Sequence, residues 1–345
     1  MRSQARGGVC VALSFALFAL AAPAFGQAAP TSQAHRTPDG HPDLQGVWSI
    51  ATATAVERPA GYPLVITREQ ADRIEKGTLF NVRSARTDAA YVPPDAGAPE
   101  KGKPLPPVGN YDVAYTDPGA HVISIGGELR SSWITYPENG RIPELTAEGK
   151  AAQAVNAKRK GSGYDNPEER GLGERCVLLS GGPPFRSGLY NNNIQIVQTP
   201  SQIAMMVEMV HDTRIMRINA QHRPDGFEQW MGDSIAHWDG ETLVVETTHL
   251  NWQQRSDRTQ LSADAKVTER FKRISDRQIL YQFEVNDPKT YKDVWRGETA
   301  LNLLNEPMFE YACHEGNYGL QNILKGGRQN DRLGRPNVDT GSRTE

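Results

Sequence analysis

Apolar and polar residues alternate along the second half of the chain, and this alternation predicts β-strands. From about Cys176 to Leu324, short period-2 segments are separated by turn-forming sequences. Two of these turns are Asp239-Gly240-Glu241 and Ser275-Asp276-Arg277, because Asp, Gly and Ser favour tight connections between strands. The pattern predicts strands at 194–199, 202–210, 213–218, 234–238, 242–249, 266–274, 278–285, 294–303 and 309–312.

Sequential strands joined by short turns predict an antiparallel meander. A long meander tends to close, because closure removes its exposed edge strands. The predicted fold class is therefore mainly β, an antiparallel meander that closes into a lipocalin-like barrel, and a β-sandwich is the alternative. Gly46-Val47-Trp48 resembles the Gly-x-Trp that opens lipocalin-type barrels. It is a candidate first strand joined to the meander, although an ordinary strand explains three residues equally well.

The first half of the chain is rich in loops. A Pro-rich run over 92–107 predicts an extended surface segment. Two short helices are predicted, one over 68–76 after the cap Thr67 and one over 147–160 after Thr146. The predicted organisation is a signal peptide over 1–26, a loop-rich region over 27–171, the barrel domain over 172–328 and a disordered tail over 329–345.

The N-terminus predicts export. Arg2 and Arg6 precede an uncharged apolar run that ends near Ala22. Cleavage is expected after the small-x-small pattern that ends at Gly26, or slightly later after Ala28. The apolar run is too short for a stable membrane span, which needs about 20 residues. We therefore expect a periplasmic or secreted protein.

Export changes the interpretation of the cysteines. Cys10 lies inside the predicted signal, which leaves Cys176 and Cys313. In an oxidising compartment two cysteines most simply form one disulfide, and two buried free thiols are the alternative. The sequence holds no Cys-x-x-Cys, so neither a redox motif nor a zinc ribbon is supported.

Charge and motif content exclude several classes of function. The chain carries 38 Lys and Arg against 41 Asp and Glu, with no basic patch, so we expect no nucleic-acid partner. A mean hydropathy of −0.58 is low for a globular enzyme, although not that of a disordered chain. The sequence has no Gly-x-Ser-x-Gly, no Gly-x-Gly-x-x-Gly before a helix and no phosphate-binding loop.

Distinctive motifs lie at 36–48, 192–200, 230–234, 239–247 and 311–318. Together they resemble an uncharacterised family of exported bacterial proteins, and the resemblance extends over most of the mature chain. The resemblance implies that the protein is exported and that it belongs to this family. It supplies no activity and no catalytic residue.

The densest polar cluster lies at 310–318. His314 and Glu315 provide a proton acceptor and a carboxylate, and Asn317 provides an amide donor. A disulfide between Cys176 and Cys313 would hold this cluster beside the segment that precedes Cys176. The alternative is a hydrogen-bonded turn locked by the same disulfide.

Two further clusters offer candidate chemistry. His211 beside Asp212 can act as a general base held in one tautomer, with Arg214 following it, or the pair is simply a hairpin turn. The other cluster suits a pocket for a flat or sugar-like ligand, although Trp in a meander is commonly a core residue. Its residues are Trp230, Asp233, His237 and Trp238.

Metal binding has weak support in the sequence. His211, His237, His249 and His314 are the histidines considered, and no two of them are closely spaced. We therefore predict no metal and no cofactor.

Three functions fit these observations. The first is an exported protein that binds a small amphipathic or aromatic ligand in a barrel pocket. The second is a metal-independent lyase or hydrolase that uses His314 with Glu315, or His211 with Asp212, as acid and base. The third is a structural or interaction protein whose Pro-rich segment wraps a partner. The expected partner is a small-molecule ligand or substrate, and no oligomeric state is predicted.

Overall fold

The computed structural model describes residues 35–78, 81–82, 117–159, 163–179, 182–251 and 259–337, all within one unit of the chain. The predicted signal peptide over 1–26, the Pro-rich run over 92–107 and the last residues of the predicted tail lie outside the described residues. In the described part of the chain, no helix has the length and apolar character needed to cross a membrane.

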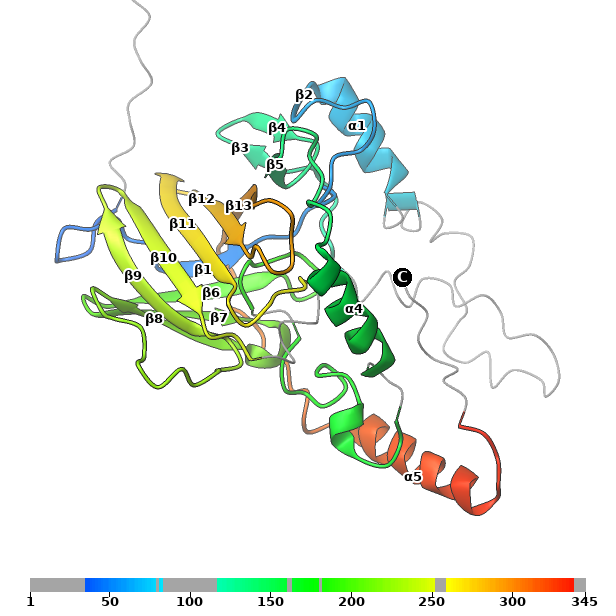
Figure 1. Ribbon diagram of the computed structural model, residues 1–345. Helices are drawn as coiled ribbons and strands as arrows, with labels where there is room; N and C mark the ends of the chain where they lie inside the picture. Colours follow the sequence, from blue (N-terminus) through cyan, green and yellow to red (C-terminus); the bar gives the residue numbers. More distant parts are fainter. Residues whose placement is uncertain are drawn as a thin grey trace, which may run out of the picture. The chain divides into compact units, whose positions relative to one another are not determined.

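The alternating segments form a closed barrel. Nine strands are hydrogen-bonded in the order β1-β6-β7-β8-β9-β10-β11-β12-β13, and β13 pairs again with β1 (Figure 1). The predicted barrel is therefore confirmed. Its strands are β1 (Gly46–Ser49), β6 (Asn193–Gln198), β7 (Gln202–Val207), β8 (Thr213–Ile218), β9 (Asp233–Asp239), β10 (Thr242–Thr248), β11 (Lys266–Ser275), β12 (Gln278–Asn286) and β13 (Trp295–Leu304).

The segment that resembles a lipocalin opening is the strand that closes the barrel. Trp48 of β1 lies opposite Ile194 of β6 on one side and Leu303 of β13 on the other, both in antiparallel register. Its indole is fully buried, and its Nε1 donates a hydrogen bond to the Leu44 carbonyl oxygen at 3.0 Å. Because β1 completes the ring, the loop-rich first half of the chain contributes a barrel strand.

One strand pair corrects the predicted antiparallel meander. β8 and β9 run parallel, with Met216 opposite Ser234. A tight turn can join only antiparallel strands, whereas parallel neighbours need a long connection. The chain accordingly leaves β8 at Ile218, forms a loop over 219–232 and re-enters the barrel wall at Asp233. We call residues 219–232 the crossover loop.

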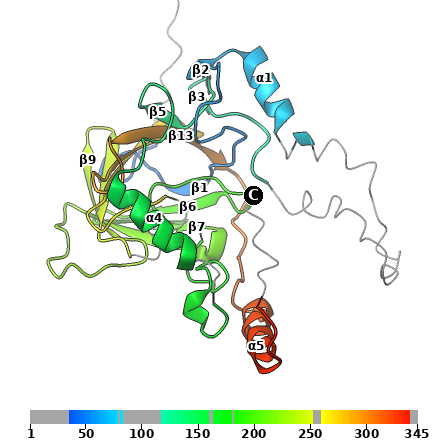
Figure 2. The ribbon, with the colours of Figure 1, turned by 45° about the vertical axis from the view of Figure 1, so that its right-hand side comes forward.

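The predicted helices are confirmed, and they lie outside the barrel wall (Figure 2). α1 (Arg68–Gly77) begins with a capping box in which Thr67 and Gln70 satisfy each other's backbone N–H groups. α4 (Ala147–Arg159) follows Thr146. Beside α1, a three-stranded sheet forms in the order β2 (Val65–Ile66), β4 (Glu128–Arg130), β3 (Ser124–Ile125). A separate short strand, β5 (Ile134–Tyr136), pairs with β13 at Arg296 and Gly297.

The C-terminal part differs from the prediction. Residues 309–312 form no strand, because the chain leaves the barrel after β13 and Phe309 is 74% exposed. A turn follows, and helix α5 (Tyr318–Arg332) begins at Asn317, whose side chain accepts a hydrogen bond from the Leu320 N–H. The helix therefore continues into the segment predicted as a disordered tail from residue 329.

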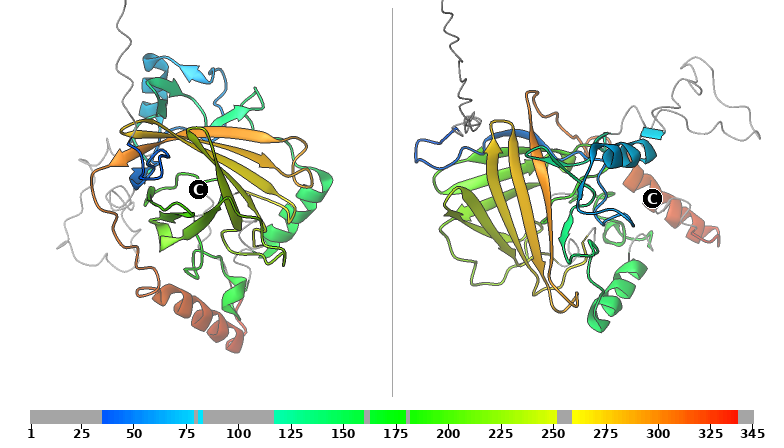
Figure 3. Two further views of the ribbon diagram at one scale, coloured as in Figure 1. Left: turned by 90° about the vertical axis from the view of Figure 1, so that its left-hand side faces the viewer. Right: turned by 90° about the horizontal axis from the view of Figure 1, so that it is seen from above.

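The barrel interior is filled with side chains. Figure 3 shows the green strands β6–β8 facing the yellow strands β10–β12 across it. Alternate residues of these strands are buried, and the largest among them are at most 1% exposed. They include Ile203, Met205, Phe271 and Tyr281, and Trp295 of β13 is buried in the same core. These side chains pack together as the barrel's core, and the ligand pocket expected inside the barrel stays a prediction.

A buried ion pair lies within this core. Arg214 of β8 pairs with Glu269 of β11 through both guanidinium NH groups, and both side chains are at most 1% exposed. The Tyr281 hydroxyl donates to Glu269 Oε1 at 2.7 Å and accepts from the Phe185 N–H. Burial, followed by the Glu269 charge, raises the pKa of Tyr281 well above its ordinary value, so the phenol remains a neutral donor.

Removing one partner of this pair is expected to destabilise the fold strongly. Glu269→Ala leaves the Arg214 charge buried without its partner, which costs about 3–5 kcal/mol of unfolding free energy. The double variant Arg214→Met with Glu269→Leu removes both charges and is expected to be more stable than Glu269→Ala alone. Urea unfolding followed by circular dichroism measures both. A Glu269→Ala protein within about 1 kcal/mol of wild type would contradict this account.

Candidate functional site

The crossover loop and the adjacent strands enclose a cleft of about 660 Å³. It lies between β8, the crossover loop and the beginning of β9. This volume is within the range typical of small-molecule sites. The residues that border it include Arg214, Arg217, Arg223, Phe227, Trp230, Asp233 and Asn251.

Two aromatic side chains of the crossover loop border the cleft and remain exposed. Phe227 is 61% exposed and Trp230 is 36% exposed. The Arg223 guanidinium lies 6.0 Å from the centre of the Phe227 ring and pairs with Asp225 at 2.6 Å. The Arg223 hydrogen bond is the main reason why the pKa of Asp225 is lowered to about 2. The cleft thus offers apolar ring faces beside charges that already have partners.

Asp233 is the point where the cleft meets the barrel. It is the first residue of β9 and is 3% exposed. Arg217 donates to its Oδ1 at 2.7 Å, and the Arg223 N–H donates to its Oδ2 at 2.8 Å. Burial raises the pKa of Asp233, but the hydrogen bonds from Arg223, His222 and Arg217 outweigh burial and leave the pKa below its ordinary value. Asp233 is therefore a carboxylate at neutral pH.

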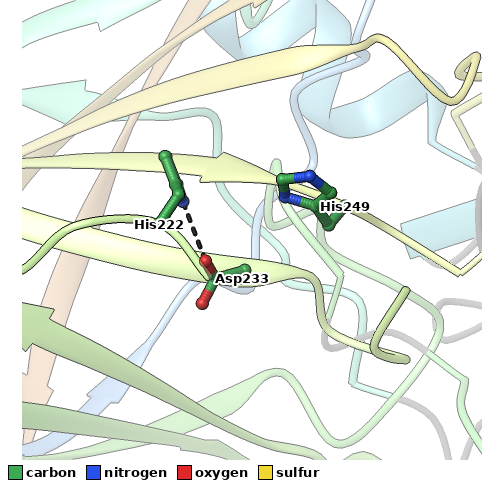
Figure 4. A group of neighbouring side chains, drawn as sticks. All are labelled: His222, Asp233 and His249. Carbon is green, nitrogen blue, oxygen red and sulfur yellow. Dashed lines mark hydrogen bonds and ion pairs between the residues drawn. The ribbon is translucent and has the colours of Figure 1, made fainter. Parts of the chain in front are cut away.

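His222 of the crossover loop lies beside Asp233 (Figure 4) and also contacts a second carboxylate, that of Glu246. Its Nδ1 is 3.0 Å from Asp233 Oδ2, and its Nε2 is 3.3 Å from Glu246 Oε1 on β10. Glu246 also pairs with Lys266 at 3.1 Å. Burial raises the pKa of Glu246, but the hydrogen bond and charge of Lys266, together with His222, lower it overall. The imidazole is thus held at both nitrogens.

His249 completes the group from the end of β10. It has a left-handed backbone with φ +52°, and its carbonyl oxygen accepts a hydrogen bond from the Gln229 N–H at 3.0 Å. The crossover loop therefore clamps the residue at this position. The Thr248 hydroxyl lies 2.9 Å from His249 Nδ1 and 3.4 Å from His222 Nδ1. One ligand atom each from His222, Asp233 and His249 lies within 4.8 Å of the other two.

The structure separates the third sequence cluster. Trp230 and Asp233 border the cleft, together with Arg214. His237 and Trp238 are toward the other end of β9, about 13 Å and about 16 Å along the strand from Asp233. His237 is exposed, and Trp238 stacks on His41 with ring centres 4.7 Å apart. The ligand-binding roles of His237 and Trp238 stay predictions.

The C-terminal cluster is held by the predicted disulfide, which is present between Cys176 and Cys313. Asn317 Nδ2 donates to the Glu174 carbonyl oxygen at 2.8 Å, and Asn317 also caps α5. His314 and Glu315 are exposed in the turn before that helix. Their expected catalytic role, and a ligand-binding role for Asn317, stay predictions.

His211 and Asp212 lie in the connection between β7 and β8, where a short 3-10 turn spans Met209–His211. His211 is exposed and has φ +48°. Asp212 is buried, and its Oδ2 accepts a hydrogen bond from the Leu179 N–H at 3.1 Å. The turn expected as the alternative is thus present, and the acid–base role of the pair stays a prediction.

His222 is the residue that the sequence analysis missed. It is 11 residues before Asp233 and His249 is 16 residues after it, and no standard metal or acid–base motif has this spacing. The sequence suggests His249 as a metal ligand only together with His211, His237 and His314. The three residues meet because of the parallel β8–β9 pairing, which the alternating pattern does not reveal.

Comparison with protein-family models, with curated proteins and with solved structures finds no match to this chain. The resemblance to an exported bacterial family therefore rests on the sequence motifs alone.

Gly232 is expected to tolerate no side chain. It has φ +75°, and a Cβ there would lie 2.6 Å from Thr247 Cγ2 and 2.8 Å from the Thr248 carbonyl oxygen. Gly226 also has a positive φ, +63°, but a Cβ there meets open space. Gly226→Ala therefore serves as the matched control for backbone strain.

We expect Gly232→Ala to lower the unfolding free energy by about 1–3 kcal/mol more than Gly226→Ala does. Urea unfolding of the two variants measures the difference. Equal losses would show that the crossover loop is not packed tightly against the end of β10.

Proposed function

We propose that this protein is an exported binding protein that holds a small aromatic or amphipathic molecule in the cleft beside the crossover loop. The observation that carries the proposal is the pair of exposed rings, Phe227 and Trp230, at a cleft of about 660 Å³. Exposed aromatic side chains gathered at a concave surface are typical of ligand sites.

The charges around the cleft favour a ligand that is polar at one end and not strongly charged. Arg217 pairs with Asp233, and Arg223 pairs with Asp225. A neutral hydroxyl or amide group can share these hydrogen-bonding groups without leaving a buried charge unpaired. The flat part of the ligand packs against Phe227 and Trp230.

Binding is proposed ahead of catalysis because of where the predicted acid–base residues lie. None of His211, Asp212, His314 and Glu315 borders the cleft as the structure describes it. Export is supported by the signal-like N-terminal sequence and by the Cys176–Cys313 disulfide, which suits an oxidising compartment.

A neutral fluorescent amine, N-phenyl-1-naphthylamine, is a suitable probe. We expect it to bind the wild-type protein with an increase in fluorescence, and Trp230→Ala to weaken binding about 10-fold or more, which corresponds to about 1.4 kcal/mol. Trp238→Ala is the matched control. Trp238 lies on β9, the strand that follows the crossover loop, but its ring stacks on His41 and does not border the cleft.

Circular dichroism verifies that both variants are folded. Unchanged probe affinity in Trp230→Ala, or an equal loss in Trp238→Ala, would place binding elsewhere and refute the proposal.

A further inference from the structure

We propose that His222, Asp233 and His249 form a binding site for a divalent transition-metal ion, with Zn²⁺ as its representative. This goes beyond the proposed ligand binding and does not depend on it. The two sites share one residue, because Asp233 also borders the cleft.

The donor atoms are already gathered closely enough. All three ligand atoms lie within 4.8 Å of one another. Zinc bonds to imidazole nitrogen and carboxylate oxygen are about 2.0–2.2 Å long, so two ligands of one tetrahedral ion are about 3.3–3.6 Å apart. Small side-chain rotations therefore bring the group onto a single ion. His222 Nδ1 and Asp233 Oδ2, 3.0 Å apart, already face each other (Figure 4).

The surrounding contacts are those that orient metal ligands. Glu246 Oε1 lies 3.3 Å from His222 Nε2, which leaves Nδ1 to face the ion. Arg217 and the Arg223 N–H hold the two oxygens of Asp233. Partners of this kind fix the orientation and protonation of metal ligands in proteins. Asp233 Oδ2 keeps a second lone pair for an ion, and the Thr248 hydroxyl, 3.4 Å from His222 Nδ1 and 2.9 Å from His249 Nδ1, would turn away from any of these nitrogens that binds it.

An ion-free explanation covers only part of the group. His222 bridging Asp233 and Glu246 forms a simple polar cluster, and the positive charges of Arg217 and Lys266 balance the carboxylates. That cluster makes no use of His249. Yet His249 is held in a left-handed conformation, uncommon for a residue with a side chain, beside the other two. A bound ion accounts for all three residues.

The donor set determines the class of metal. Two imidazoles and one carboxylate suit Zn²⁺ and its neighbours in the first transition row, whereas Mg²⁺ and Ca²⁺ prefer all-oxygen sites. The ion would connect the crossover loop to the start of β9 and to the residue that follows β10.

The test is isothermal titration of the EDTA-dialysed protein with Zn²⁺, and separately with Mg²⁺. We expect one Zn²⁺ per chain with a Kd of about 1 μM or tighter, no Mg²⁺ binding, and a rise in melting temperature with Zn²⁺. His249→Ala is expected to weaken Zn²⁺ binding about 100-fold. His237→Ala, which removes an exposed histidine from β9, is the control and is expected to bind like wild type.

His249→Asn provides a second variant if His249→Ala does not fold, because Asn also adopts a left-handed backbone. Titration with Co²⁺ adds a spectroscopic measurement, since a nitrogen-ligated cobalt ion absorbs visible light and the band should be lost in His249→Asn. The proposal is overturned if wild type binds no Zn²⁺ at about 100 μM, or if the His249 variants bind it like His237→Ala.

The probe titration distinguishes this proposal from the proposed function. If the wild-type protein binds the probe but not Zn²⁺, the metal site alone is refuted. If the wild-type protein binds Zn²⁺ but not the probe, the ligand cleft alone is refuted.

Discussion

The parallel pairing of β8 with β9 is the constraint on which the candidate site depends. Every other neighbouring pair in the barrel is antiparallel. A parallel pair cannot be joined by a tight turn, so the chain must make the long excursion of the crossover loop. That loop supplies Phe227, Trp230 and His222, and its return to the wall at Asp233 places all of them around one carboxylate.

The packed interior explains why the site lies on the wall. Arg214 and Glu269 join β8 to β11 through the core, and the Tyr281 hydroxyl from β12 donates a further hydrogen bond to Glu269. Together with the large apolar side chains around them, these groups leave the barrel's interior to the protein itself. A rigid barrel with a filled core is a suitable support for a cleft, because the strands that carry Asp233 and His249 cannot move independently.

Much of the fold could be predicted from short sequence patterns, because a strand or a helix cap depends mainly on residues that are close together in the sequence. Alternation located β6 through β13, the Thr67 capping box located α1, and two cysteines outside the predicted signal peptide predicted the disulfide. The site could be predicted only in part. Trp230 and Asp233 were selected as pocket residues, but His222 was not, because its partners are distant in sequence. Helix α5 was also missed, since the preceding segment at 309–312 alternates like a strand although it lies outside the barrel.

The central claim is that small molecules bind at the crossover loop and not inside the barrel. The most direct measurement is the ¹H–¹⁵N spectrum of the tryptophan indole groups during titration with N-phenyl-1-naphthylamine. The account predicts that the Trp230 resonance shifts, while those of Trp48 and Trp295, which are buried in the core, stay in place. Shifts at Trp48 and Trp295 with an unchanged Trp230 resonance would show that the ligand enters the barrel and would contradict the account.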